Sequence, residues 1–112
     1  MNYQKIMQDL LKPPIAFQRS FVDAGGSVLA GLMLSQAYYW TLRTENTDGW
    51  FFKTQKDWED ETGMTRYEQE GARKKLRSTG FWQEELRGVP AKLFFRIDIP
   101  KLLDFLATKY AE

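Results

Sequence analysis

Two helix-start signals in the middle of the chain constrain the fold more than any other feature. Thr54 and Thr65 are each followed by an acidic residue three positions later. At this spacing the threonine hydroxyl accepts from the backbone of the acidic residue, whose side chain returns the bond, and a helix begins. Gly63 can end the first helix, and Gly80 the second. The sequence therefore predicts a helix, a tight turn and a second helix that runs to about Ser78.

Two strands are predicted after the second helix. Residues 92–99 alternate between apolar and mixed positions, as a half-buried strand does, and residues 81–86 form their partner across a turn at 87–91. Pro100 then suits the start of a last helix. Helix, turn, helix and hairpin in this order is the layout of a winged helix-turn-helix. We therefore expect an α+β fold with a helical core, a C-terminal β-hairpin wing and a closing helix.

The first half of the chain supplies a leader and the core. Residues 1–14 are predicted to be a leader with a loose helix, which Pro13 and Pro14 end, and residues 15–112 the domain. Residues 15–22 are interpreted as a strand or extended lead-in. Residues 28–43, capped by Ser27, are apolar nearly all round, which is typical of a buried helix. An interface for a homodimer is the alternative for the aromatic residues of this helix. A short aromatic strand is expected at 49–53.

Composition excludes several kinds of site. The chain has 112 residues, of which 43% are hydrophobic, and it contains neither cysteine nor histidine. Disulfides, thiolate or histidine zinc sites and a histidine general base are therefore excluded. No carboxylate pair stands out, so neither an enzyme nor a cofactor is expected. The longest apolar run, at 28–34, is too short to span a membrane, and no secretory signal opens the chain, which predicts a cytoplasmic protein.

The near-neutral total charge of +1 hides a polarised distribution. Residues 44–63 carry six acids against two bases, a net charge of −4, whereas residues 64–80 carry five bases against two acids, a net charge of +3. The basic segment coincides with the second helix of the predicted pair. That helix is the one a helix-turn-helix presents to the major groove.

The second helix is predicted to expose a stripe of arginines. Counting about 100° per residue groups Thr65, Gln69, Ala72 and Leu76 toward the core. The candidate nucleic-acid contacts on the exposed side are Arg66, Tyr67, Arg73, Lys74 and Arg77, and those near the hairpin tip are Arg87 and Lys92. Arginine suits this task because its planar fork binds phosphate or guanine through two bonds at once. Any solvated helix has a charged outer face. The prediction of DNA binding therefore depends on the position of the arginine stripe, on the helix that a helix-turn-helix presents to the groove.

Residues 15–106 resemble the winged-helix domain of phage and plasmid replication proteins, of the replisome-organiser or replication-initiator kind. The motifs that carry the resemblance are Ala16-Phe17 with Gly26-Ser27-Val28, the segment from Leu34 to Trp40, the segment from Asp48 to Thr54, the helix from Thr65 to Leu76, and the turn from Leu86 to Ala91. The resemblance implies a protein that binds double-stranded DNA in replication initiation or its regulation, with a replisome or host protein as a further partner. Such proteins usually continue into a second domain.

Binding to a host protein is the alternative function. Small phage proteins reuse such scaffolds as inhibitors of host nucleoproteins, and the acidic run from Asp57 to Glu61 would suit a protein-binding surface of that kind. Binding of duplex DNA at low salt distinguishes the two.

Overall fold

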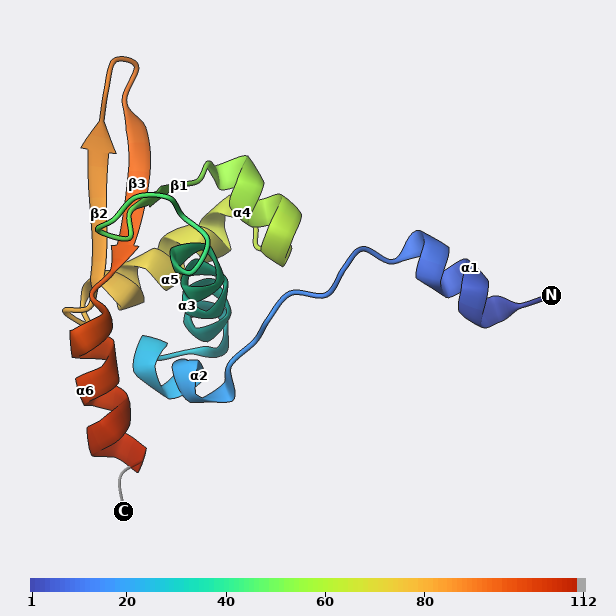
Figure 1. Ribbon diagram of the computed structural model, residues 1–112, viewed down its shortest axis with the longest axis horizontal. Coiled ribbons are helices and arrows are strands. Elements are labelled where there is room, and N and C mark those ends of the chain that lie inside the picture. Colours follow the sequence, from blue (N-terminus) through green and yellow to red (C-terminus); the bar gives the residue numbers. More distant parts are fainter. Residues whose placement is uncertain (111–112) are drawn as a thin grey trace.

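The computed structural model describes residues 1–110 and has an α+β fold (Figure 1). In this part of the chain, helices and a three-stranded antiparallel sheet with the order β1-β3-β2 enclose one core. The helices are α1 (Tyr3–Leu10), α2 (Arg19–Gly25), α3 (Val28–Thr41), α4 (Gln55–Thr62), α5 (Arg66–Arg77) and α6 (Ile99–Tyr110), and the strands are β1 (Phe51–Phe52), β2 (Trp82–Arg87) and β3 (Lys92–Ile97). The arrangement is compatible with a winged helix.

The helix pair α4–α5 forms as predicted. Thr54 Oγ1 accepts from the backbone of Asp57 at 3.0 Å, and the Asp57 carboxylate accepts from the backbone of Thr54 at 2.9 Å. Thr65 and Glu68 make the same reciprocal pair at 3.2 and 3.0 Å. Gly63 ends α4 in the left-handed region at φ 78°, which glycine adopts without steric cost. Both capping signals and the turn between them are therefore confirmed.

The sheet has one strand more than the predicted hairpin. β2 and β3 pair over Trp82–Arg87 and Lys92–Ile97, which confirms the hairpin. The aromatic strand expected at 49–53 is present as β1, and it pairs antiparallel with the free edge of β3. The prediction of a two-stranded ribbon was therefore incomplete. The pairing joins residues more than 40 positions apart, which no local pattern shows.

Phe95 on β3 sits at the centre of the core. Its ring lies 5.8 Å from that of Phe51, 5.4 Å from that of Trp58 and 5.7 Å from that of Trp82. Leu76 of α5 is fully buried beside them. Packed aromatic rings of this size contribute much of a core's stability, so the sheet, α4 and α5 are held together here. Met33, Leu34 and Ala37 of α3 are likewise fully buried, which confirms 28–43 as the core helix.

The interpretation of residues 15–22 as a strand or extended lead-in was wrong in its second half. Residues 15–18 are extended, but α2 begins at Arg19 and buries Phe21 and Ala24 against α3. The two helices approach closely at Gly31, where an added Cβ would lie 2.7 Å from the Cα of Val22. A short apolar run suits a strand and a buried helix turn equally, and packing against α3 decides between them.

The leader stands away from the body, with α1 at the end of an extended segment that contains Pro13 and Pro14 (Figure 1). The loose leading helix is thus confirmed, and none of its residues is buried. Within residues 1–110, no helix combines the length and apolar character needed to cross a bilayer.

Candidate nucleic-acid interface

The outward face of α5 is narrower than the predicted stripe. Gln69, Ala72 and Leu76 are buried as expected, and Arg66, Tyr67 and Lys74 are exposed. At about 100° of rotation per residue, the position of Lys74 is nearly opposite the centre of the buried face of α5. Tyr67 is 88% exposed. The outward face is therefore centred on Tyr67 and Lys74.

Arg73 is not exposed, and the expectation of three exposed arginines was wrong at this position. Its side chain is 15% exposed and donates to both carboxylate oxygens of Glu84 on β2, at 2.9 and 2.7 Å. It also donates to Glu70 at 2.8 Å. Glu84 accepts in addition from Trp82 Nε1 at 2.8 Å and lies 3.3 Å from Arg77. Arg73 thus ties α5 to the sheet, and Arg77 sits at the rim of the same network.

The network shifts the pKa of both its central partners. Burial acts to raise the pKa of the Glu84 carboxyl, but hydrogen bonds from Arg73 and Trp82 and the positive charge of Arg73 outweigh it, so the pKa lies below its ordinary value. The hydrogen bond to Glu84 raises the pKa of Arg73. Both groups are charged at neutral pH, where the ion pair joins α5 to β2.

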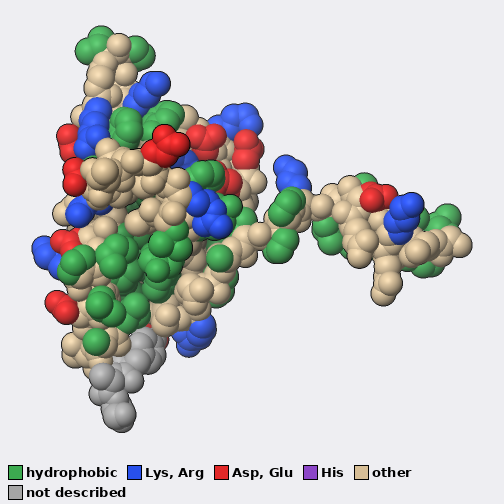
Figure 2. Space-filling view, in the orientation of Figure 1, with side chains coloured by type: hydrophobic (Ala, Val, Ile, Leu, Met, Phe, Trp, Pro, Cys, Tyr) green, Lys and Arg blue, Asp and Glu red, His purple; other side chains and the backbone are tan. Residues whose placement is uncertain are grey.

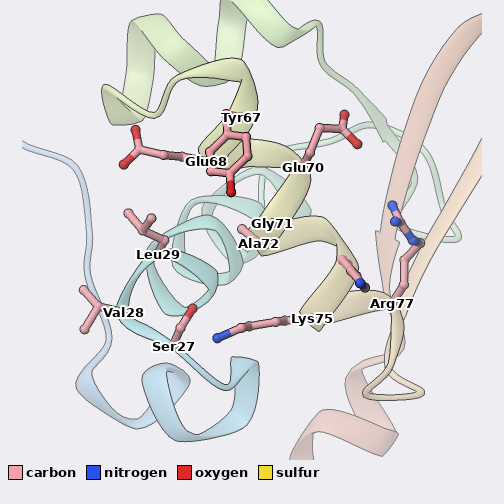
Figure 3. Close-up of a pocket in the computed structure, with 11 residues that line it drawn as sticks. Ser27, Val28, Leu29, Tyr67, Glu68, Glu70, Gly71, Ala72, Lys75 and Arg77 are labelled. Carbon is pink, nitrogen blue, oxygen red and sulfur yellow. The ribbon is translucent and has the colours of Figure 1, made fainter.

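An open groove of about 660 Å³ runs between the outward face of α5 and the first turn of α3 (Figure 3). Val28 and Leu29 of α3 and Tyr67 and Gly71 of α5 line it. Lys75 points from α5 across the groove toward Ser27 (Figure 3). Lys75 belongs to the basic segment but was not among the predicted contacts, because the helical count places it away from the expected stripe.

The predicted hairpin contacts Arg87 and Lys92 face each other across β2 and β3. The Arg87 guanidinium lies 4.7 Å from the ring of Trp50 and 3.3 Å from Glu85, and the Lys92 ammonium lies 5.2 Å from the ring of Phe52. Both cations belong to the sheet face that points away from α5. The structure therefore brings Arg66, Tyr67, Lys74 and Arg77 together on α5 and places Arg87 and Lys92 on a separate surface.

The acidic surface of α4 is smaller than the sequence indicates. The Glu61 carboxylate turns inward, where it accepts from Gln36 Nε2 and Trp40 Nε1 at 2.6 Å each and pairs with the ammonium of the buried Lys53. Asp60 is exposed and pairs with Lys56 at 2.7 Å. Less acidic surface is therefore free to repel a phosphate backbone or to attract a basic protein.

The described part of the chain holds no group of three or more acidic side chains placed to bind a metal ion. Comparison with known proteins found no match to this chain among family models, curated proteins or solved structures.

Proposed function

We propose that the protein is a winged-helix DNA-binding protein that contacts the major groove of duplex DNA with α5 and the sugar-phosphate backbone with the hairpin. The observation that carries this proposal is the set of cations on the outward side of α5. Arg66, Lys74 and Lys75 are exposed, and within residues 1–110 none of them has an ion-pair partner. Exposed cations on the second helix of such a pair are the means by which phosphates and base edges are bound.

Roles differ along the helix under this proposal. Arg66, Tyr67 and Lys74 contact DNA directly, and Lys75 and Arg77 contact it from the two flanks. Arg73 holds α5 on the sheet and positions the others, because its fork is already occupied by Glu84 and Glu70. Arg87 and Lys92 supply the wing contact. A part in phage or plasmid replication, in the cytoplasm and without catalysis or a cofactor, rests on the resemblance of the sequence motifs.

Titration of fluorescently labelled duplex DNA at low and moderate salt tests the proposal. The double variant Arg66→Ala with Lys74→Ala should bind at least about tenfold more weakly. The dependence of log affinity on log salt should also flatten, by roughly 0.9 for each phosphate that the variant no longer neutralises. A charge-matched control, Lys101→Ala with Lys109→Ala on α6, should bind as the parent does.

Absence of duplex binding by the parent protein at low salt would overturn the proposal. The inhibitor of a host nucleoprotein would then take its place. A pull-down from host lysate, with and without nuclease, would identify that partner, because a direct protein contact survives removal of nucleic acid.

A further inference from the structure

The sheet face that points away from α3 and α5, here termed the outer sheet face, carries a pair of aromatic rings. Phe52 of β1 lies directly opposite Phe94 of β3, with ring centroids 5.7 Å apart. Their chain neighbours Phe51 and Phe95 are buried on the opposite side, as alternation along a strand requires. Phe52 is 41% exposed. The strand register thus holds two rings at the surface that the core does not use.

Cations border the two rings. Arg87 and Lys92 are cross-strand partners on the same face. The Arg87 guanidinium lies over the ring of Phe94 at 4.9 Å and the Lys92 ammonium over the ring of Phe52 at 5.2 Å, so a base that stacks on either ring moves the cation aside toward its own phosphate. Lys92 has no ion pair with any residue in the described range 1–110. Apolar side chains flanked by lysine and arginine are visible just below the hairpin tip (Figure 2). Glu85 lies opposite Phe94 on the same face and pairs with Arg87 at 3.3 Å. Lys92 and Arg96 leave the face with a net positive charge beside its apolar surface.

A hollow of about 390 Å³ adjoins this pair at the end of the hairpin. Arg87, Lys92 and Phe94 line it together with the turn residues 88–90. The turn leaves it open to solvent, because Val89 is fully exposed. A planar group that enters the hollow meets the Phe94 ring and two cations at once.

We propose that the outer sheet face binds single-stranded DNA. Unpaired bases stack on Phe52 and Phe94, and phosphates pair with Arg87 and Lys92, which is the combination that single-strand binding requires. A duplex offers no free base faces to such rings. DNA and RNA share this stacking and phosphate chemistry, and the comparison of oligothymidine with oligouridine in the test distinguishes them.

This site shares Arg87 and Lys92 with the proposed wing contact but uses no residue of α5. Glu84 on the inner side of the sheet holds α5 through Arg73, so α5 and the outer sheet face lie on opposite sides of the sheet. Variants on α5 and at Phe52 therefore distinguish the two proposals, because Tyr67 belongs only to the duplex contact and Phe52 only to the outer sheet face.

The test is titration of a labelled oligothymidine of about 12 nucleotides, followed by anisotropy and by quenching of tryptophan fluorescence. Trp50 borders the outer sheet face, whereas Trp58 and Trp82 are buried and the half-buried Trp40 is held between Glu61 and Lys53, so quenching reports chiefly on this surface. Phe52→Ala should weaken binding about tenfold or more, because one stacking ring is removed. Phe52→Tyr should retain binding, since the ring remains.

Two further variants allow the proposal to be tested even if Phe52→Ala unfolds the sheet. Lys92→Ala changes an exposed side chain and should reduce the salt slope by about 0.7, the value for one neutralised phosphate of a single strand. Tyr67→Ala removes an exposed aromatic residue on α5 and should leave oligothymidine binding unchanged while it weakens duplex binding. Phe52→Tyr should bind duplex as the parent does, whereas Lys92→Ala also removes a proposed wing contact and should weaken duplex binding.

Three results would overturn the proposal. They are no binding of oligothymidine at low salt, equal affinity of folded Phe52→Ala or Lys92→Ala and the parent, and a tenfold preference for oligouridine over oligothymidine, which would assign the face to RNA.

Discussion

Replacing Glu84 with glutamine should destabilise the protein far more than an ordinary surface substitution. The side chain keeps its shape, but Arg73, which is only 15% exposed, loses its bidentate carboxylate and retains Glu70 alone. Hydrogen bonds to a charged group contribute about 1.5–3 kcal/mol, and leaving a buried charge unpaired costs about 3–5 kcal/mol. Because this pair is only partly buried, we expect the free energy of unfolding to fall by about 2 kcal/mol.

Urea unfolding followed by tryptophan fluorescence measures this decrease, which should correspond to a melting temperature lower by roughly 8 °C. Asp60→Asn is the matched control, because it removes the charge of an ion pair on an exposed helix face whose lysine is 82% exposed. It should leave stability close to that of the parent.

A double-mutant cycle separates the ion pair from other effects. Arg73→Met and Glu84→Gln together should destabilise the protein by less than the sum of the two single variants, because the second change removes a charge that the first has already left unpaired. A destabilisation by Glu84→Gln no larger than that by Asp60→Asn would refute the structural role of Arg73. That residue would then return to the candidates for direct DNA contact.

Two further predictions concern acid and helix propensity. The folded pKa of Glu84 lies below its ordinary value of 4.5, so its contribution to stability is present above about pH 4.5 and is lost as pH falls through the folded pKa. The difference in free energy of unfolding between the parent and Glu84→Gln should therefore have its full size at pH 7. Urea unfolding curves measured below pH 4.5 should show a smaller difference. Gly71→Ala should raise the free energy of unfolding by about 0.5–1 kcal/mol in thermal melts, because an added Cβ at this interior helix position meets no atom within 4 Å. Gly63→Ala, at φ 78°, should destabilise. A lower melting temperature for Gly71→Ala would contradict the prediction, because it would mean that the added Cβ meets a neighbouring atom.

The parts of the fold that sequence predicted correctly depend on neighbours along the chain. Thr54 and Thr65 cap helices through residues three positions away, and Leu76 is buried by the period of its own helix. The parts that it missed depend on distant partners. Arg73 lies on the flank of α5, and only the approach of Glu84 from β2 decides that it is bound rather than free.

Dependence on distant residues also explains why residues 19–22 were not predicted as a helix and why the predicted hairpin contact lacked its aromatic residues. The apolar run that contains Phe21 has no period of its own, so its helix depends on the close approach of α3. Arg87 and Lys92 were predicted as hairpin cations, but the aromatic surface beneath them needs β1, whose pairing with β3 is not visible in either strand alone.

The position of Phe95 has a consequence for how the chain matures during translation. Its ring contacts Phe51, Trp58 and Trp82, yet it belongs to the next-to-last element, so α2 to α5 leave the ribosome before the residue that closes their core. Until β3 is synthesised, β1 has no partner and the two tryptophans have no cover. The nascent chain therefore presents a basic helix and uncovered aromatic residues together, and it acquires a cooperative fold only once β3 has been synthesised.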